Sequence, residues 1–411
     1  MQSTMSMSEK TKYYLELEEK YGAHNYHPIP VVLNRGEGVF VWDVDNKRYY
    51  DFLSGYSALN HGHGHPKIVQ AFIEQAGKLT LTSRAFHNDQ LAEFTAFITQ
   101  YFGYDKVLPM NTGVEAVETA IKLCRRWGYD VKGIAENKAK IIVCENNFHG
   151  RTSTVISFSS DPSSYVKFGP YMPGFVIIPF NDLKALASAL SDKNIAGFLV
   201  EPIQGEAGVI VPDEDYLTKA KQLCEEANTL FIADEIQTGL CRTGKMLACD
   251  HEKVRPDILL LGKALSGGLM PASAVLADDG IMMTIKPGEH GSTYGGNPLA
   301  SRIAITALQV LKDEKMAENA LSMGELLRSE LKKINSPFIS IIRGKGLLNG
   351  LVIQHKNENA AWEFCLSLKE NGLLAKPTHG DKIRFAPPLL INSDQIMECI
   401  GIIKKSLSVF E

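Results

Sequence analysis

The segments TLFIADE at residues 229–235 and DILLLGK at residues 257–263 decide the fold of this chain. Each contains a short run that is apolar on both faces, and each closes on charged residues. Two earlier segments, KIIVCE (140–145) and AGFLVEP (196–202), have the same character. Short strands that are apolar on both faces and separated by helical stretches are typical of a parallel sheet covered by helices on both sides. The pattern therefore predicts an α/β domain.

This alternation extends from about residue 66 to residue 310, and the chain changes character on either side of it. Residues up to about Gly22 predict a short helix, with Tyr13, Tyr14 and Leu17 as its apolar side. The segment VFVWDVDNKRYYDF (39–52) then predicts two short strands around an Asp-Asn turn.

A long helical region at about 298–335 is followed by short strands and helices that predict a separate α+β domain. The chain has 411 residues, more than a single hydrophobic core usually serves. We expect an N-terminal segment (1–50) that joins the small domain, a large domain (51–310) and a C-terminal small α+β domain (311–411).

The composition excludes several classes of protein. With 45% hydrophobic and 22% charged residues, the chain is an ordinary globular sequence. Its net charge of -4 offers no basic field to hold a nucleic-acid backbone. No apolar run approaches the ~18 residues of a membrane span. We therefore expect neither nucleic-acid nor membrane binding.

The first residues, MQSTMSMSEK, contain neither the apolar region of a secretory signal nor the arginines of a mitochondrial transit peptide. The seven cysteines are scattered, and none forms a C-x-x-C pair. Reduced thiols and a cytoplasmic location are the simplest interpretation.

Asp234 and Lys263 follow two of the predicted strands. In an open parallel sheet, ligands bind beyond the carboxyl ends of the strands, so both side chains can face one pocket. The charge of a buried lysine must be paired or removed, either by a lowered pKa or by a covalent bond to a carbonyl cofactor. The residues that follow, ALSGGLMPASA, predict a loop that leaves room for a flat ligand. A structural lysine in a salt bridge is the competing interpretation.

Asp234 also suits a pyridine-ring cofactor. A carboxylate beside the ring nitrogen keeps that nitrogen protonated, so that the ring can accept electrons from a developing carbanion. Gln237, three residues later, could donate a hydrogen bond to the phenolic oxygen of such a ring. Alone, Asp234 fits a structural carboxylate better, whereas Asp234 and Lys263 together favour the cofactor.

Two loops resemble phosphate-binding sites. Asn111, Thr112 and Gly113 precede a helix with apolar residues at 114, 117, 121 and 124. The amino end of a helix attracts anions through its free N–H groups. The segment HGSTYGGNP (290–298) is a second loop of this kind before a helix. For either loop taken by itself, an ordinary helix cap is the better explanation.

Two other motifs, a possible nucleotide-binding loop and a run of histidines, do not fit the sites that they resemble. The GK of LLLGKALSGG lacks the Ser or Thr that follows the lysine in a nucleotide-binding P-loop. His61, His63 and His65 stand at a spacing of two, but no acidic or Cys ligands lie near them in the sequence. We expect no metal site.

Three long segments, FIADEIQTGLCRTGK (231–245), PDILLLGKALSGGLMP (256–271) and HGSTYGGNPL (290–299), resemble the class III aminotransferases. The resemblance covers nearly the whole chain. YGAHNYHPIPV (21–31), EPIQGEAGV (201–209) and KPTHGDKIRFAPP (376–388) are more narrowly similar to the ornithine δ-aminotransferases. The resemblance implies pyridoxal-phosphate fold type I and a homodimer with its active sites at the subunit interface.

The resemblance also implies roles for single residues. Lys263 would bind pyridoxal 5'-phosphate covalently and move the reacting proton, and Asp234 would hold the ring nitrogen. The other expected cofactor contacts are Gln237 at the phenolic oxygen, Phe148 on the ring face, Thr112, Gly113 and Val114 at the phosphate, and Ser292 and Thr293 from the partner subunit. His149 receives no role.

The implied substrates are L-ornithine, which donates its δ-amino group, and 2-oxoglutarate, which accepts it in a ping-pong reaction. Arg151 would bind the carboxylate remote from the reacting carbon. Arg384 would pair with Glu206 while ornithine is bound and bind the α-carboxylate of 2-oxoglutarate when Glu206 releases it. Tyr26 and Tyr56 would place ornithine so that the δ-amine reacts.

Rival interpretations keep the cofactor and change the substrate to acetylornithine, 4-aminobutyrate or another ω-amine. A non-catalytic protein that kept the fold is a rival from another class, but the joint presence of Lys263, Asp234 and Arg384 opposes it. Catabolic use of ornithine and proline supply look alike in the sequence.

Overall fold

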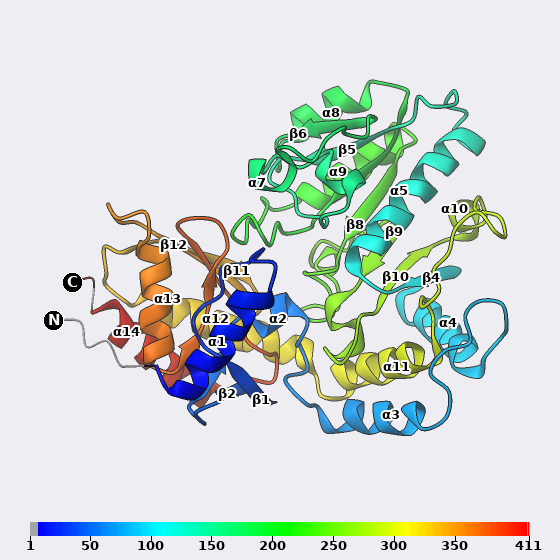
Figure 1. Ribbon diagram of the computed structural model, residues 1–411. Coiled ribbons are helices and arrows are strands. Elements are labelled where there is room, and N and C mark those ends of the chain that lie inside the picture. Colours follow the sequence, from blue (N-terminus) through cyan, green and yellow to red (C-terminus); the bar gives the residue numbers. More distant parts are fainter. Residues whose placement is uncertain (1–6, 409, 411) are drawn as a thin grey trace.

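The computed structural model describes residues 7–408 and residue 410. A seven-stranded sheet with strand order β4-β10-β9-β8-β7-β5-β6 forms the larger part of the molecule (Figure 1). Its strands are β4 Lys106–Met110, β5 Lys140–Cys144, β6 Phe175–Ile178, β7 Ile195–Val200, β8 Leu230–Asp234, β9 Ile258–Leu261 and β10 Ser273–Ala277. Strand β10 runs opposite to the other six strands of this sheet, which all point in one direction. The predicted α/β domain with a mostly parallel sheet is confirmed.

Helices cover both faces of this sheet because its strands are apolar on both faces. Adjacent residues of β5 show the alternation: Ile141 packs into a core beneath α5 (Gly113–Asp130), and Ile142 packs into a second core on the other face. The second core also contains residues of α8 (Leu183–Leu190) and α9 (Tyr216–Glu226). Burying one such isoleucine stabilises the fold by about 1.5–3 kcal/mol.

Three details differ from the sequence prediction. The connection from β8 to β9 carries only a short 3₁₀ turn, Cys249–His251, in place of the expected helix. The small residues after Lys263 end in strand β10, whose five residues are all buried. The predicted long helical region is two helices, α11 (Pro298–Asp313) and α12 (Met316–Lys332), separated at Lys315 by a left-handed backbone with φ of 51°.

Two four-stranded sheets form the smaller part of the molecule. One has the order β1-β2-β3-β13 and the other β11-β12-β15-β14, with α12, α13 (Ala360–Glu370) and α14 (Ser393–Leu407) packed beside them. Their strands are β1 Leu33–Glu37, β2 Phe40–Asp43, β3 Arg48–Asp51, β11 Ile339–Lys345, β12 Leu348–Ile353, β13 Leu373–Leu374, β14 Lys376–Pro377 and β15 Lys382–Phe385.

The N-terminal strands join the C-terminal chain through β13, which pairs in parallel with β3. One hydrophobic core contains Tyr50 from β3 together with Phe364 and Phe385 from the C-terminal chain. The boundaries at residues 50 and 310 stay a prediction, and α11 runs across the second.

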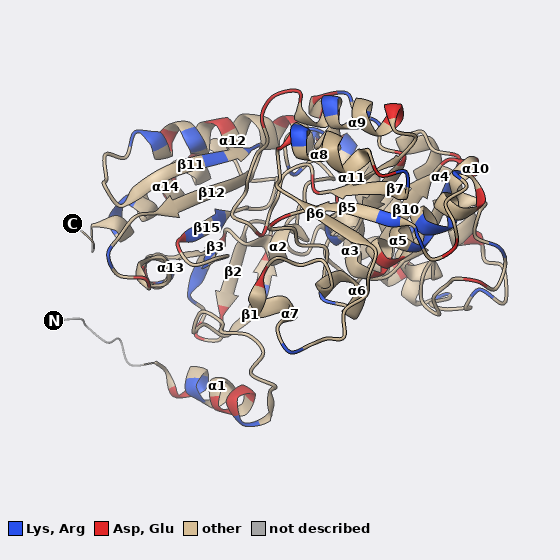
Figure 2. Ribbon diagram, turned by 90° about the horizontal axis from the view of Figure 1, so that it is seen from above, with Lys and Arg blue, Asp and Glu red and all other residues tan. Residues whose placement is uncertain are grey.

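The N-terminal helix α1 (Glu9–Tyr21) is confirmed and stands away from the rest of the molecule (Figure 2). Ser8 and Thr11 donate hydrogen bonds to the carboxylate of Asp45, 2.6 and 2.8 Å away. Its expected apolar side is exposed, with Tyr13 at 58%. Across the described residues, no helix combines the length and apolar character needed to cross a bilayer.

The remaining helices are short or lie along the edges of the large sheet. They are α2 (Ser54–Ser57), α3 (Pro66–Ala76), α4 (Asp89–Phe102), α6 (Ser153–Ile156), α7 (Pro162–Tyr165) and α10 (Asp279–Met282). Helices α3 and α4 pack against α11 beside the β4 end of the sheet (Figure 1).

Candidate active site

Lys263 lies beyond the carboxyl end of β9 and opens a 3₁₀ turn, Lys263–Ser266. Its backbone is left-handed, with φ of 44°, a strained conformation for a side-chain-bearing residue. Burial lowers the pKa of the Lys263 ammonium, and Arg384 adds to this effect, while Glu206, Asp234 and Glu201 oppose it. A lysine held in this way loses its proton more readily than one in water.

Asp234 ends the neighbouring parallel strand β8 and forms a buried pair with His149. Its Oδ2 lies 2.6 Å from His149 Nδ1, and its Oδ1 accepts a hydrogen bond from the Ile236 amide at 3.1 Å. Burial alone would lower the pKa of His149, but Asp234 and Glu201 raise it. His149 therefore holds its proton against the Asp234 carboxylate. Within the described chain, its buried Nε2 has no hydrogen-bond partner.

Phe148 lies in the loop after β5, directly before His149. The guanidinium carbon of Arg151 lies 5.6 Å from the centroid of the Phe148 ring. Gly150 has φ of 123°, and a Cβ there would lie 2.4 Å from Val114 Cγ2. The absence of a side chain at Gly150 thus lets this loop pack closely against the start of α5.

The start of α5 is a closed capping box. Thr112 caps the helix, and the Glu115 carboxylate accepts the amides of Asn111 and Thr112 at 3.0 and 2.6 Å. The next amides, those of Gly113 and Val114, belong to the first turn and have no partner within the helix. Asn111 also donates a hydrogen bond to Ser292 Oγ at 2.8 Å, which brings the second predicted phosphate loop to the same place.

Glu206, Gln237 and Arg384 form one hydrogen-bonded cluster. Glu206 Oε1 accepts hydrogen bonds from Arg384 Nη1 at 2.6 Å and from Gln237 Nε2 at 3.0 Å. Arg384 Nη1 also donates to Gln237 Oε1 at 3.0 Å. Burial would raise the pKa of Glu206, but Arg384 and Lys263 outweigh it and lower the pKa to about 2. Glu206 and Arg384 are therefore a fully charged pair at neutral pH.

Arg384 is fully buried, and only part of its guanidinium is bonded. Among the described residues, its Nε and Nη2 atoms have no hydrogen-bond partner. A carboxylate satisfies two donors of one guanidinium at once. The unused donors of Arg384 are therefore suited to a carboxylate of a substrate.

Tyr26 and Tyr56 lie on the same side of the small β11-β12-β15-β14 sheet. The Arg384 guanidinium carbon is 5.3 Å from the Tyr56 ring centroid, and Lys376 Nζ is 6.0 Å from that of Tyr26. Lys376 stands directly opposite Arg384 on the neighbouring strand, so their side chains share one face. Tyr56 has a left-handed backbone, with φ of 59°.

A cavity of about 400 Å³ borders this group on the Phe148 side. Phe148, His149 and Glu206 line it, and His379 and Lys382 line its wall from the C-terminal chain. Two of the lining residues contact the charged groups described above: His149 lies against Asp234, and Glu206 accepts a hydrogen bond from Arg384.

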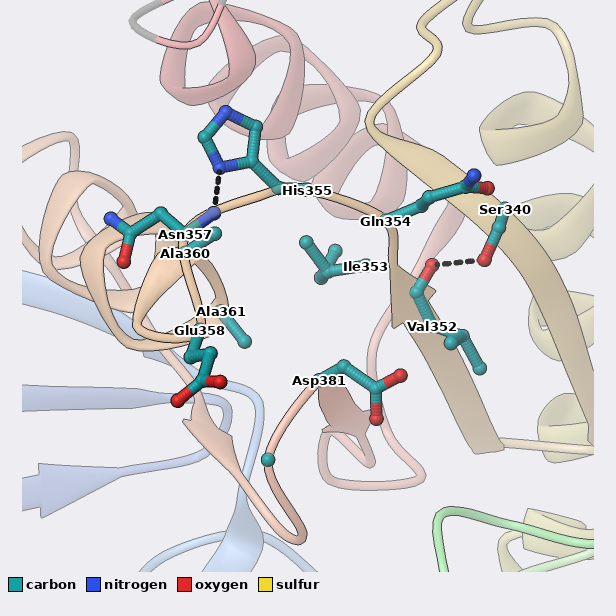
Figure 3. A pocket seen from close by; sticks show the side chains of 11 residues that line it. Ser340, Val352, Ile353, Gln354, His355, Asn357, Glu358, Ala360, Ala361 and Asp381 are labelled. Carbon is teal, nitrogen blue, oxygen red and sulfur yellow. Dashed lines mark hydrogen bonds between the residues drawn. The ribbon is translucent and has the colours of Figure 1, made fainter.

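A different hollow lies on β11, β12 and α13 (Figure 3). Its lining includes Glu358 and Asp381 and contains none of the predicted site residues. It offers carboxylates rather than cations, so it does not suit a phosphate or a dicarboxylate.

The three histidines of the H-G-H-G-H run bind separate partners. His61 Nε2 contacts the Ala307 carbonyl, His63 contacts Asp51, and His65 contacts Glu314. No cluster of three or more His, Cys, Asp or Glu side chains in the described part of the chain is placed to hold a metal ion.

The sequence profile of the class-III aminotransferases matches residues 21–407. The chain belongs to the class-III aminotransferase family. A relative from Rattus norvegicus, ornithine aminotransferase, mitochondrial, is 62% identical over 97% of this chain and 91% of its own length.

Solved structures agree with this assignment. The ornithine aminotransferase of Toxoplasma gondii, described with partial occupancy of PLP at its active site, superposes with a TM-score of 0.95. It is 48% identical and the match covers 97% of this chain and 94% of that one. An acetylornithine aminotransferase from Elizabethkingia anophelis is 58% identical, with a TM-score of 0.90, and the match covers 97% of this chain and 99% of that one.

The protein is a pyridoxal-phosphate-dependent aminotransferase with an α/β fold of type I. The residues present fit this cofactor. Lys263 has a lowered pKa and can bind a carbonyl group, Asp234 has a carboxylate at a strand end, and α5 has free amides for a phosphate. Close packing by Gly150 holds the Phe148 loop against these amides.

Sequence reasoning missed two residues of this site. Glu201 lies directly after β7, and the rule that selected Asp234 and Lys263 at strand ends selects it too. His149, to which no role was given, carries the hydrogen bond to Asp234. Nothing in the sequence indicates that a histidine 85 positions earlier reaches that carboxylate.

Proposed function

We propose that the protein transfers the δ-amino group of L-ornithine to 2-oxoglutarate, which gives glutamate-5-semialdehyde and L-glutamate. The ion pair of Glu206 with Arg384 is the observation that carries this proposal. Ornithine brings one carboxylate and 2-oxoglutarate brings two, so the pocket must offer a second cation, besides Arg151, in only one half-reaction. An arginine that a neighbouring glutamate neutralises meets this need.

The geometry of the pair supports a switch. Glu206 Oε1 neutralises Arg384 at 2.6 Å while ornithine reacts. When Glu206 moves aside, Arg384 presents its whole fork to the α-carboxylate of 2-oxoglutarate. Gln237 bonds to both partners and uses its amide oxygen and one amide hydrogen. Its second amide hydrogen is left for the phenolic oxygen of the cofactor.

Lys263 would be the base that removes the proton from the δ-carbon of ornithine and carries it during the transfer. Its lowered pKa supports this role, because a base must be free of its own proton near neutral pH. When bound, the cofactor supplies the electron sink for the negative charge on that carbon. Asp234 holds the proton on the ring nitrogen, and His149 holds Asp234.

Phe148 covers one face of the ring and excludes water from it. Thr112, Gly113 and Val114 hold the phosphate through the free amides of α5 and the Thr112 hydroxyl. Ser292 and Thr293 complete the phosphate site from the partner subunit. Within one chain, Ser292 already accepts a hydrogen bond from Asn111 at 2.8 Å, so the contribution of this loop across the interface rests on the resemblance to the family.

Substrate choice rests on Tyr26, Tyr56 and Arg151. Arg151 binds the carboxylate remote from the reacting carbon, and the two tyrosines flank the α-amino group. An acetyl group on that amine would have to share the space between the rings. Since one similar structure is an acetylornithine aminotransferase, this space is the feature that separates the two substrates.

Two exposed surfaces support a homodimer. Helix α1 and its following loop expose Tyr21 and Tyr26 at 74% and 68%, and the 290–298 loop exposes Tyr294 at 58%. Exposed aromatic groups of this size mark interfaces. We infer that the partner subunit covers them and that the active sites lie at this interface.

We also propose a cytoplasmic location, since all seven cysteines are free and buried, as in a reducing compartment. The rat relative is named mitochondrial. Fractionation of cells that make the protein tests the location. Ornithine turnover would link the protein to arginine metabolism and to proline biosynthesis.

The absorbance spectrum of the purified protein tests the cofactor assignment. Visible absorbance of lysine-bound pyridoxal phosphate should decline when ornithine is added. Borohydride reduction followed by peptide mass spectrometry should place the cofactor on Lys263, and Lys263→Ala should lose it. A wild-type protein that takes up no pyridoxal phosphate contradicts the assignment.

Relative kcat/KM on ornithine, N-acetylornithine and 4-aminobutyrate tests the substrate. Ornithine should be preferred, with parallel lines in double-reciprocal plots against 2-oxoglutarate. A preference for N-acetylornithine would keep the reaction class and overturn the proposed substrate. Converging lines would contradict the ping-pong scheme.

A further inference from the structure

Glu201 is a buried carboxylate at the site that the mechanism above does not use. It follows β7 and is 6% exposed. Its two oxygens accept hydrogen bonds from the amides of Phe148, at 2.9 Å, and Gly205, at 3.1 Å. The carboxylate therefore joins the loop of Phe148 and His149 to the loop of Glu206.

The charges around Glu201 come from several elements. Burial raises the pKa of Glu201 to about 7, His149 lowers it, and Asp234 raises it. In turn, Glu201 raises the pKa values of His149 and Lys263. Glu201 also raises the pKa of the Cys144 thiol, at the end of β5. A buried carboxylate that raises the pKa values of two site residues is part of the site's charge balance.

Without Glu201, the buried cations of the site outnumber its carboxylates by one. Arg384 and Glu206 neutralise one another at 2.6 Å. Asp234 is then the carboxylate for two cations, the His149 imidazolium and the protonated ring nitrogen of the cofactor. Two cations against one carboxylate in a buried site favour loss of one of the protons.

We propose that Glu201 is a positioning residue that supplies the second negative charge, so that His149 and the ring nitrogen hold their protons together. The inference rests on the proposed cofactor. The amides of Phe148 and Gly205 hold the carboxylate in place, and its charge acts through His149 and Asp234 rather than on substrate. The carboxylate is ionised when the protonated ring nitrogen is present.

Reconstitution of the cofactor-free protein distinguishes two roles of Glu201. One is to supply a negative charge, and the other is only to join the two loops through hydrogen bonds. The two ligands are pyridoxal phosphate and its analogue with carbon in place of the ring nitrogen. In Glu201→Gln, affinity for pyridoxal phosphate should fall about tenfold, the equivalent of one pKa unit. Affinity for the carbon analogue should stay near that of wild type, because no ring proton needs a counter-charge. Equal losses for both ligands would overturn the proposal.

Two further variants guard against a folding defect. Glu201→Asp keeps the charge and alters the reach to the two amides, so it should retain the preference for pyridoxal phosphate. Loss of that preference would overturn the proposal. Glu235→Gln removes another fully buried carboxylate, which Thr238 and Cys249 hold. It should leave the ratio of the two affinities unchanged.

A second readout needs no cofactor. In the cofactor-free protein labelled with ¹⁵N-histidine, Glu201→Gln should lower the pKa of His149, and an unchanged value would contradict the charge coupling. If wild-type protein fails to bind pyridoxal phosphate, the proposed function fails, while this titration still tests Glu201.

Discussion

At the scale of single residues, the site works through buried charges that are paired with one another. Glu206 and Arg384 meet at 2.6 Å, and His149 and Asp234 also meet at 2.6 Å. Removing one member of such a pair leaves the other buried and uncompensated. Each substitution at these positions therefore changes the binding preference of the site as well as its stability.

The Glu206 charge should appear in the pH dependence of stability. Its pKa is lowered from 4.5 to about 2 in the folded state. A lowered pKa stabilises the fold above the unfolded value and loses that contribution as pH falls toward the folded value. The difference in unfolding free energy between wild type and Glu206→Gln should shrink between about pH 5 and about pH 2, by up to about 3 kcal/mol.

Denaturant titrations at several pH values measure this difference. The matched control is Glu37→Gln, because Glu37 pairs with Arg35 on the surface. Surface pairs contribute little, so this control should differ little from wild type. A pH-independent difference for Glu206→Gln would contradict a charged pair.

Removal of the Glu206 side chain should also change which amino acids react. In Glu206→Ala, Arg384 is free in both half-reactions and binds α-carboxylates. We expect the ratio of kcat/KM for glutamate to that for ornithine to rise about tenfold or more, because the freed guanidinium gains a charged hydrogen bond of about 1.5–3 kcal/mol. A ratio that stays at the wild-type value would show that the pair is a static salt bridge.

Residues at strand ends could be predicted, and their partners could not. Asp234 and Lys263 follow apolar runs that are easy to recognise, and a general rule places ligands beyond them. The partner of Asp234 is His149, on another loop, and only folding brings the two together. Lys376 lies opposite Arg384 on the neighbouring strand, and no pattern in the sequence indicates this contact.

At the scale of elements, close packing decides where helices sit. A Cβ on Gly324, within α12, would lie 1.8 Å from the Gly346 carbonyl oxygen in the turn between β11 and β12. That atom is backbone and cannot move without shifting the turn. The helix therefore touches the sheet that carries Arg384 through a glycine.

Gly324→Ala should destabilise the protein although alanine is the better helix former. The clash should cost roughly 2 kcal/mol or more, typical of overpacking, against a gain of about 1 kcal/mol in helix propensity. Gly401→Ala is the matched control, since α14 leaves open space at that position. It should raise stability. Chemical denaturation measures both, and stabilisation by both variants would contradict the close contact.

Elements with strong patterns were predicted well, and elements with weak patterns were not. The apolar runs of β5, β7, β8 and β9 gave correct strands, and Thr112 marked the start of α5. Strand β10 was missed because its Ser and Ala residues look like a loop until β4 and β9 bury them. The connection from β8 to β9 was wrongly expected to be helical.

At the scale of the whole molecule, the smaller sheets and the large sheet are joined by buried contacts. Arg242 is fully buried and bonds to Asn60 Oδ1 and to the carbonyls of Leu347 and Pro387. Burial lowers the pKa of its guanidinium to about 9. This arginine binds the loop after β8 to the C-terminal chain and so fixes Arg384 relative to Lys263.

The proposed dimer should be measurable in solution. Light scattering after gel filtration should give twice the 45.3 kDa mass of one chain. Removal of residues 1–25 should weaken the dimer and lower affinity for pyridoxal phosphate together, because the proposed dimer has its active sites at the interface. A monomer with full activity would contradict both the dimer and the shared site.

The mixed order of strands limited what the sequence could predict at this scale. Tandem apolar runs indicated the parallel sheet, but β13 has two residues and no pattern of its own. Its pairing with β3 depends on a contact across more than three hundred positions. Domain boundaries are hard to predict for the same reason, because segments far apart in the chain, such as β3 and β13, are neighbours in space.

The pairing of β3 with β13 affects how the chain folds during its synthesis on the ribosome. Strand β3 emerges early, whereas its parallel neighbour β13 emerges when nearly the whole chain has been made. Until then the edge of β3 offers unpaired amides and carbonyls to any other nascent chain. Translation speed and chaperone supply should therefore affect the yield of this enzyme more than that of proteins whose first strands pair at once.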